Sequence, residues 1–130
     1  MPVEFDIRPS VKQNTDLPFE RLRVVQSLPE LRLSDIRAGV VFVFAGWSGP
    51  AVMALRRLTR LLSTLDLGSL DVVILDNDSM TGEEMIRLFG HVFRGAGETL
   101  WIRDGRVIAE LSAFRPESEA LIVGHTRELL

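Results

Sequence analysis

The turn at residues 46–51, Gly-Trp-Ser-Gly-Pro-Ala, places a serine where a strand-like run, Val40–Ala45, gives way to a helix-like run. A serine at a strand–helix junction can be a nucleophile, as in the G-x-S-x-G elbow of many hydrolases. Here Pro50 occupies the position of the second glycine, so the motif is not met. Serine is also a preferred helix N-cap, and proline is tolerated in a first helical turn. The sequence therefore predicts that Ser48 caps a helix.

The same turn has the composition that commonly surrounds thiol–disulfide sites, but the chain contains no cysteine. A cysteine thiol has a pKa of about 8.5, which a helix N-terminus can lower into the working range. A serine hydroxyl is far less acidic. A helix dipole contributes about 0.3–1 kcal/mol, whereas one pKa unit costs about 1.4 kcal/mol, so the dipole cannot generate an alkoxide at neutral pH. We therefore expect Ser48 and Ala51 to support no disulfide exchange.

Acidic residues follow a second strand-like run, at Asp76-Asn77-Asp78. A calcium-binding EF-hand loop would need further acceptors and then a glycine, but Met80 and Thr81 stand in the way. Carboxylates between a strand and a helix are ordinarily turn and cap residues. We expect that role here, with no metal site and no cofactor.

Arginine supplies nearly all of the basic side chains. Arg56, Arg57 and Arg60 fall on the polar side of a helical pattern, which indicates either a solvated face or a surface for an anionic partner. The chain has two histidines. His91 follows a helix stop and is expected to cap carbonyl groups, and His125 is expected to be exposed on the last helix.

Apolar periodicity predicts where strands and helices form. Five runs are strand-like: 21–26, 40–45, 70–75, 99–102 and 106–111. Three segments have helical spacing and capping residues: Ser48 to a stop at Gly68, 81–89, and 116–129. Residues 28–37 are interpreted as an irregular or short helical connection. Residues 1–18, which include three prolines, are interpreted as an N-terminal arm with a short strand at Val3–Ile7.

From residue 40 onward the predicted order is strand–helix–strand–helix–hairpin–helix. Two strand–helix units favour parallel pairing with a right-handed crossover. Asp104-Gly105 lies between the last two strand-like runs and is typical of a tight hairpin, which adds antiparallel strands. The sequence thus predicts an α/β fold with a mixed sheet.

Length and composition indicate one globular domain over residues 1–130, with 46% hydrophobic and 25% charged residues. The net charge of −3 gives no attraction toward nucleic acid. No apolar run approaches the roughly 20 residues that span a bilayer, and the N-terminus lacks the basic-then-apolar pattern of a signal peptide. We expect no nucleic-acid or membrane partner and, by default, a cytoplasmic location.

Three segments in this order, VVFVFAGWSGPA, LDVVILDND and TLWIRDGRVIAEL, resemble the thioredoxin family over residues 38–130. The resemblance implies a thioredoxin-like three-layer fold, with a central mixed sheet, flanking helices and a C-terminal β-hairpin plus helix. In that family the tryptophan equivalent to Trp47 lies on an exposed apolar rim that contacts substrate proteins.

The chain departs from the family at each group that the redox chemistry uses. Where the family pattern W-C-G-P-C has its cysteines, this chain has Ser48 and Ala51. The buried acid six residues before the first cysteine corresponds to Phe42, and the cis-proline facing the dithiol corresponds to Glu98. An engineered replacement of two cysteines would also give WSGPA, but it would not account for Phe42 and Glu98.

The resemblance, with these departures, implies a non-enzymatic protein-binding module: an assembly chaperone, a subunit of a larger complex or a neutraliser of a bacterial toxin. The residues expected to form the partner-binding surface are Trp47, Ser48, Gly49, Pro50, Asp76, Asn77, Gly97 and Glu98. The same surface could instead join two copies of the chain. The alternative is an enzyme or small-molecule binder that uses a groove around Ser48 and Glu98, with His91 near them.

Overall fold

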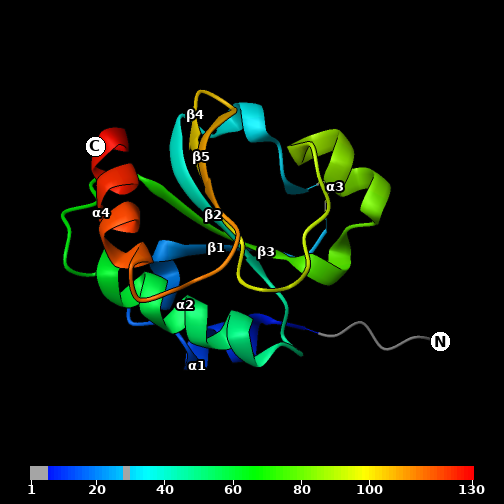
Figure 1. Cartoon of the computed structure of the whole chain (residues 1–130), viewed down its shortest axis with the longest axis horizontal. Helices are drawn as coiled ribbons and strands as arrows, with labels where there is room; N and C mark the ends of the chain where they lie inside the picture. The colour runs from blue at the N-terminus through cyan, green and yellow to red at the C-terminus, as the bar shows by residue number, and fades with distance from the viewer. Residues whose placement is uncertain (1–5, 28–29) are drawn as a thin grey trace.

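In the computed structural model, which describes residues 6–27 and 30–130, the strands form one five-stranded mixed sheet (Figure 1). The strands are β1 (Leu22–Val25), β2 (Ala38–Phe44), β3 (Asp71–Asp76), β4 (Thr99–Arg103) and β5 (Arg106–Leu111). Their order across the sheet is β1-β3-β2-β4-β5. β3 is parallel to both β1 and β2, while β4 is antiparallel to both β2 and β5. The predicted mixed sheet and C-terminal hairpin are confirmed.

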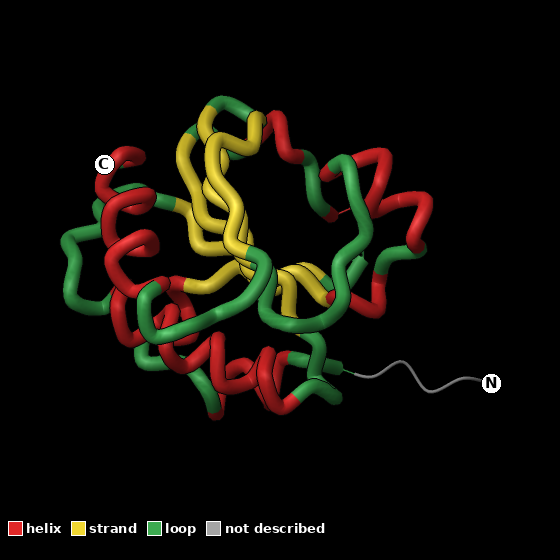
Figure 2. Tube along the Cα trace, in the orientation of Figure 1, coloured by secondary structure: helices red, strands yellow, loops and turns green. Residues whose placement is uncertain are grey.

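Helices cover both faces of the sheet (Figures 1 and 2). They are α1 (Arg8–Gln13), α2 (Gly49–Leu62), α3 (Gly82–Phe89) and α4 (Ser118–Leu129), with short 3-10 turns η1 (Phe19–Arg21), η3 (Leu33–Asp35) and η4 (Asn77–Ser79). α1, α2 and α4 pack on one face and α3 on the other, which gives three layers. Over the described ranges, every helix falls short of the length and apolar character needed to cross a membrane.

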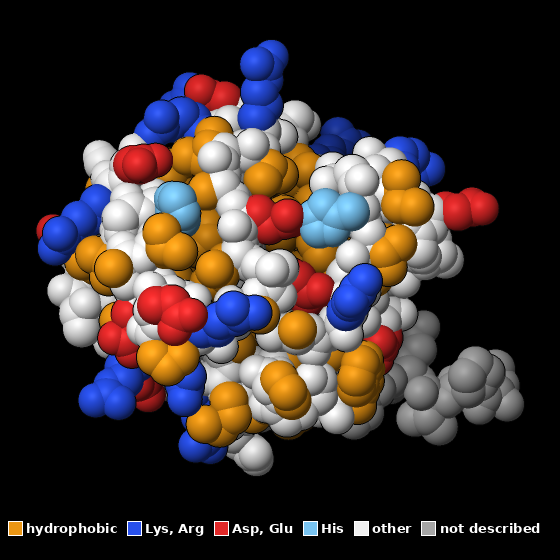
Figure 3. Space-filling view, in the orientation of Figure 1, with side chains coloured by type: hydrophobic (Ala, Val, Ile, Leu, Met, Phe, Trp, Pro, Cys, Tyr) orange, Lys and Arg blue, Asp and Glu red, His pale blue; other side chains and the backbone are white. Residues whose placement is uncertain are grey.

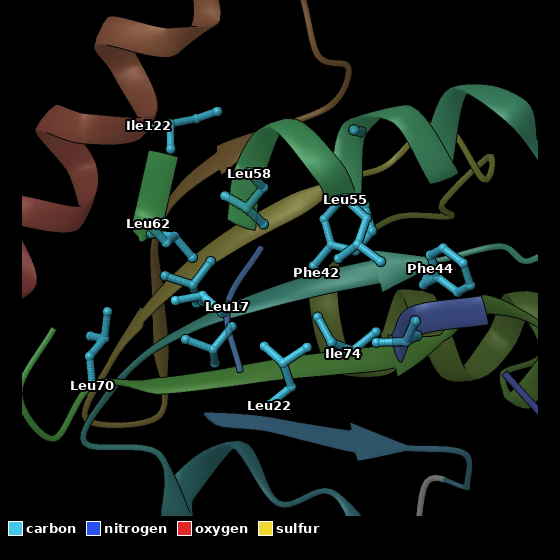
Figure 4. Packing of buried hydrophobic residues seen from close by; sticks show 14 of the residues in the cluster. Leu17, Leu22, Phe42, Phe44, Leu55, Leu58, Leu62, Leu70, Ile74 and Ile122 are labelled. Carbon is cyan, nitrogen blue, oxygen red and sulfur yellow. The ribbon is translucent and has the colours of Figure 1, made fainter. Parts of the chain in front are cut away.

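The central strand β2 is buried on both sides because its residues alternate between two cores. Those facing α2 are Val40, Phe42 and Phe44. Those facing α3 are Val41 and Val43. Helical spacing brings a stripe of leucines from α2 onto the first group: Leu55, Leu58 and Leu62 (Figure 4). The core therefore fixes both the strand and the helix that flank the turn at residues 45–48.

α2 ends at Leu62, well before the predicted stop at Gly68. The hydroxyl of Ser63 donates to the carbonyl of Arg60 at 2.6 Å, and the Thr64 hydroxyl makes the equivalent bond, also at 2.6 Å. Such bonds from side chains to preceding carbonyls compete with continuation of a helix. The predicted end of this helix was therefore wrong, and Gly68, with a φ of +55°, belongs to the following turn.

The segment interpreted as an N-terminal arm contains a packed helix, α1. Ile7, Val11 and Leu17 are buried in the core on the α2 side of the sheet. Pro9, one of the prolines that led to the interpretation as an arm, lies in the first turn of α1, where proline is tolerated. The strand predicted at Val3–Ile7 lies largely outside the described residues.

Several predicted local features are confirmed. Ser48 caps α2, and α3 starts directly after its N-cap Thr81, close to the predicted start at residue 81. Gly90 ends α3 with a φ of +88°. Asp104 and Gly105 close the β4–β5 hairpin, both with positive φ.

Two connections differ in detail from the sequence pattern. Within residues 30–37, the described part of the predicted 28–37 connection, a short helical turn forms at η3. α4 begins at Ser118 rather than at Pro116, because the Ser118 hydroxyl accepts a hydrogen bond from the backbone N–H of Arg115 at 3.1 Å and orders the turn before the helix.

Gly97 should tolerate no side chain. Its φ is +88°, and a Cβ there would lie 2.6 Å from Cβ of Ala54 and 3.4 Å from the ring of Phe42. We expect Gly97→Ala to lower the free energy of unfolding by about 2–5 kcal/mol, since overpacking costs about 1–3 kcal/mol and left-handed backbone about 1–2 kcal/mol more. Urea unfolding followed by circular dichroism measures the change.

The matched control is Gly124→Ala in α4, where a Cβ would meet nothing within 4 Å. This change should be neutral or stabilising by up to about 1 kcal/mol, because alanine favours a helix. Equal stability of Gly97→Ala and the unmodified chain would contradict the close packing at Gly97.

Candidate functional site

The turn after β2 and the turn after β3 lie side by side, because Phe44 pairs with Asp76 in parallel register. This neighbourhood brings Trp47 to Asp78. The indole Nε1–H of Trp47 donates to both oxygens of the Asp78 carboxylate, at 3.1 and 3.0 Å. The tryptophan nevertheless remains 66% exposed. The indole N–H thus has its hydrogen-bond acceptor within the chain, while most of the side-chain surface faces solvent.

A second contact holds the Trp47 ring from the loop between α3 and β4, drawn in yellow in Figure 1. A Cβ on Gly95 would lie 2.8 Å from Cη2 and 3.0 Å from Cζ2 of the indole. The glycine also has a φ of +77°, which side chains rarely adopt. Only glycine lets the loop backbone approach the ring this closely, so Trp47 is held at two points.

Ser48 is buried, and its hydroxyl accepts a hydrogen bond from the backbone N–H of Ala51 at 3.3 Å. This bond is the helix cap that the sequence predicts. Gly49 and Pro50 follow in the first turn of α2 and are exposed. The serine oxygen therefore has a structural role at the start of α2.

Glu98 is only 4% exposed, and its carboxylate turns toward its own loop. One oxygen accepts from the backbone N–H of Arg94 at 2.5 Å and the other from Ala96 at 3.1 Å. The Glu98 carbonyl accepts the backbone N–H of Val43 at 2.8 Å, which ties the loop to β2. Gly97 packs beside Ala54 of α2. These contacts fix the loop that carries Gly95.

Asp76 and Asn77 are also buried. One carboxylate oxygen of Asp76 accepts the backbone N–H of Asp78 at 3.0 Å and so caps η4. Burial raises the pKa of Asp76; the bond from the Asp78 N–H opposes this rise, and the charge of Asp78 adds to it. The amide oxygen of Asn77 is buried without a hydrogen-bond partner among the described residues. Both side chains are hydrogen-bonded to Asp78, the residue that holds Trp47.

His91 has a partner that its sequence position does not reveal. Its Nε2 lies 2.7 Å from both carboxylate oxygens of Glu110 on β5, and its ring meets Phe93 edge-on with centroids 5.1 Å apart. The Val92 carbonyl and the Glu110 carboxylate raise the pKa of His91. The pair joins the start of the loop to the hairpin.

The arginines and the second histidine considered from the sequence make contacts away from the Trp47 turn. Arg56 donates to Asn14 at 2.7 Å, and the Arg57 guanidinium lies 5.8 Å above the Phe114 ring. His125 is half-buried, with its ring 5.0 Å from that of Trp101. Across residues 6–27 and 30–130, no three acidic or histidine side chains gather in a group that could hold a metal ion.

The residues predicted to form the partner-binding surface therefore fall into two groups, exposed and buried. Trp47, Gly49 and Pro50 are exposed and can touch a partner directly. The other members are buried and can only position them: Ser48, Asp76, Asn77, Gly97 and Glu98. Asp78, whose carboxylate accepts the tryptophan N–H, was absent from the predicted set.

A search of protein-family models finds no match to the chain, and a search of curated proteins finds none either. Solved structures do match. Thioredoxin O2 from Arabidopsis thaliana, in the oxidized state, matches with a TM-score of 0.65 at 16% identity, covering 84% of this chain and 94% of that one. Thioredoxin from Malassezia sympodialis (Mala s 13) gives a TM-score of 0.62 at 18% identity, covering 81% and 90%.

Mitochondrial thioredoxin 3 from Saccharomyces cerevisiae, in the oxidized form, gives a TM-score of 0.61 at 20% identity, covering 83% of this chain and 96% of that one. At such identities the likeness concerns the fold alone. The chain has a thioredoxin-like α/β fold, as the sequence resemblance implies.

The His91–Glu110 pair should show a pH dependence. Because the pKa of His91 is raised in the folded chain, the pair stabilises the fold fully below the unfolded pKa of about 6.5, and this contribution is lost as the pH rises through the folded pKa. We expect an NMR titration of the His91 ring to give a pKa above 6.5, and Glu110→Gln to lower it.

Glu119→Gln, on the exposed part of α4, is the control and should leave the His91 titration unchanged. A His91 titration that is the same in the Glu110→Gln variant and the unmodified chain would refute the assigned pairing.

Proposed function

We propose that this chain is a non-enzymatic, thioredoxin-like protein-binding module whose main contact residue is Trp47. The roles open to such a module are those of an assembly chaperone, a complex subunit or a toxin neutraliser. The proposal depends on one observation: a large aromatic side chain is 66% exposed although two separate parts of the chain hold it in place.

A tryptophan held in this way is suited to binding. Immobilising a mobile side chain at an interface costs about 0.5–1.5 kcal/mol of conformational entropy. The bond to Asp78 and the contact with Gly95 already restrain the Trp47 ring in the free chain, so less of this entropy is lost on binding. Tryptophan is also among the residues most often found in interface hot spots.

The surface next to Trp47 continues along α2. Pro50 and Met53 are three residues apart in this helix, so they lie on the same side of it, and both are exposed. Figure 3 shows hydrophobic side chains at the surface over the lower part of this face, where α2 lies. An exposed aromatic side chain followed by an apolar helical turn favours a protein partner over a small polar ligand.

The contacts of the polar groups favour binding over catalysis. The Ser48 hydroxyl caps α2, and the Glu98 carboxylate accepts two backbone N–H groups of its own loop. His91 binds Glu110. With these groups engaged in separate structural contacts, and with no cysteine in the chain, we propose no disulfide exchange and no catalytic role for Ser48, Glu98 and His91.

The test is to capture the partner with the intact chain and then titrate it against variants. Trp47→Ala should weaken binding by at least about 2 kcal/mol, about 30-fold, if Trp47 is a hot spot. Leu121→Ala removes another exposed apolar side chain, on α4 away from the start of α2 (Figure 1), and should change the affinity less than about 2-fold.

Unchanged affinity in Trp47→Ala would exclude this surface. A second copy of the chain is one candidate partner, and size-exclusion chromatography at several concentrations identifies it, because a Trp47-mediated dimer dissociates on dilution and in the variant.

A further inference from the structure

We propose that Trp47 and Asp78 together form a receptor for an arginine side chain presented by the protein partner. The inference rests on the proposed protein-binding function and specifies the chemistry that the surface recognises.

The indole and the carboxylate are complementary to a guanidinium in position and in charge. The Trp47 N–H is already bonded to Asp78, so the exposed part of the tryptophan is its aromatic ring rather than a donor. A cation over an indole ring is attracted by the ring's negative face. The carboxylate adjoins the rim of the ring, so a planar cation on the ring can reach both groups.

Asp78 keeps acceptor capacity for such a cation. It receives the Trp47 N–H and, on one oxygen, the side-chain amide of Asn77 at 3.4 Å. A carboxylate has about four lone-pair positions, so acceptor sites remain open. Asp78 is exposed, and these sites are therefore accessible to a partner.

The negative charge of Asp78 has no cationic partner within the described residues. The ion pairs found there are Asp6 with Arg8 and His91 with Glu110. Arg94 is adjacent in sequence to Gly95, which touches the ring, but it forms no ion pair with Asp78 in this part of the chain. A partner cation would therefore be attracted by Asp78.

Arginine fits this pair better than lysine does. Its guanidinium is flat, so it can stack on the face of the indole while the N–H groups at its edge reach the carboxylate at the rim of the ring. The chain already contains one guanidinium over an aromatic ring, that of Arg57 above Phe114. An acidic partner segment would be repelled by Asp78. The surface therefore selects a basic, arginine-containing segment.

NMR titration of the full-length, ¹⁵N-labelled chain tests this directly. The chain has two tryptophans, and Trp101 is fully buried, so its indole signal is an internal reference. The probes are acetyl-Gly-Arg-Gly-Arg-Gly-amide and the analogues with lysine, glutamine or glutamate in place of arginine. We expect the arginine peptide to shift the Trp47 signal and to bind about 3- to 30-fold more tightly than the glutamine peptide.

Asp78→Asn isolates the charge, because asparagine keeps an oxygen that can accept the indole N–H. It should weaken arginine-peptide binding about 2- to 5-fold. Asp71→Asn, the same chemical change at the exposed opposite end of β3, is the control and should have no effect. Equal binding of the arginine and glutamine peptides, or an Asp78→Asn variant that binds like the unmodified chain, would overturn the arginine site.

The Trp47→Ala and Asp78→Asn variants distinguish failure of the arginine site from failure of the protein-binding function. If Trp47→Ala loses the captured partner and Asp78→Asn keeps it at full affinity, the protein-binding function stands and the arginine receptor is wrong. If Trp47→Ala keeps the partner at full affinity, the protein-binding function at this surface is itself wrong.

Discussion

The hydrogen bonds from the Trp47 indole to Asp78 connect the turns that follow two neighbouring parallel strands. They form only because Phe44 and Asp76 are paired in register, which places the next residues of both chain segments together. Two neighbouring residues support these hydrogen bonds. Asp76 caps the turn that carries Asp78, and Gly95 leaves room for the ring.

The positions that serve redox chemistry in the family that the sequence resembles have packing and capping roles here. Phe42 is fully buried, with its ring 6.4 Å from that of Phe44, in the core beneath α2. Ser48 caps α2, and Glu98 orders the loop before β4 through two backbone N–H groups. Each of these residues is compatible with the thioredoxin-like fold, and Trp47 is the prominent exposed side chain of this surface.

Local patterns in the sequence predicted most of the fold. The apolar run in β2 is continuous because both of its faces are buried, and the leucines of α2 recur at helical spacing because one face is buried. The end of α2 was missed, because the competing hydroxyls of Ser63 and Thr64 are a weak local signal next to the glycine at Gly68.

The site was only partly predictable. The position of Trp47 at a strand–helix turn follows from its neighbours, but its bond to Asp78 spans 31 residues and depends on strand register. The His91–Glu110 pair likewise joins residues 19 apart through the placement of a hairpin strand. The burial of Glu98 depends on a loop conformation, with glycine at positive φ before it, that single-sequence patterns do not specify.

The most direct measurement of the central claim is oxidative footprinting of Trp47 in the free chain and in the complex with its captured partner. Bound protein should shield the exposed indole, so Trp47 should be oxidised readily when free and be protected at least several-fold in the complex, while the buried Trp101 stays unreactive in both. Equal oxidation of Trp47 in the free and bound states would contradict the account.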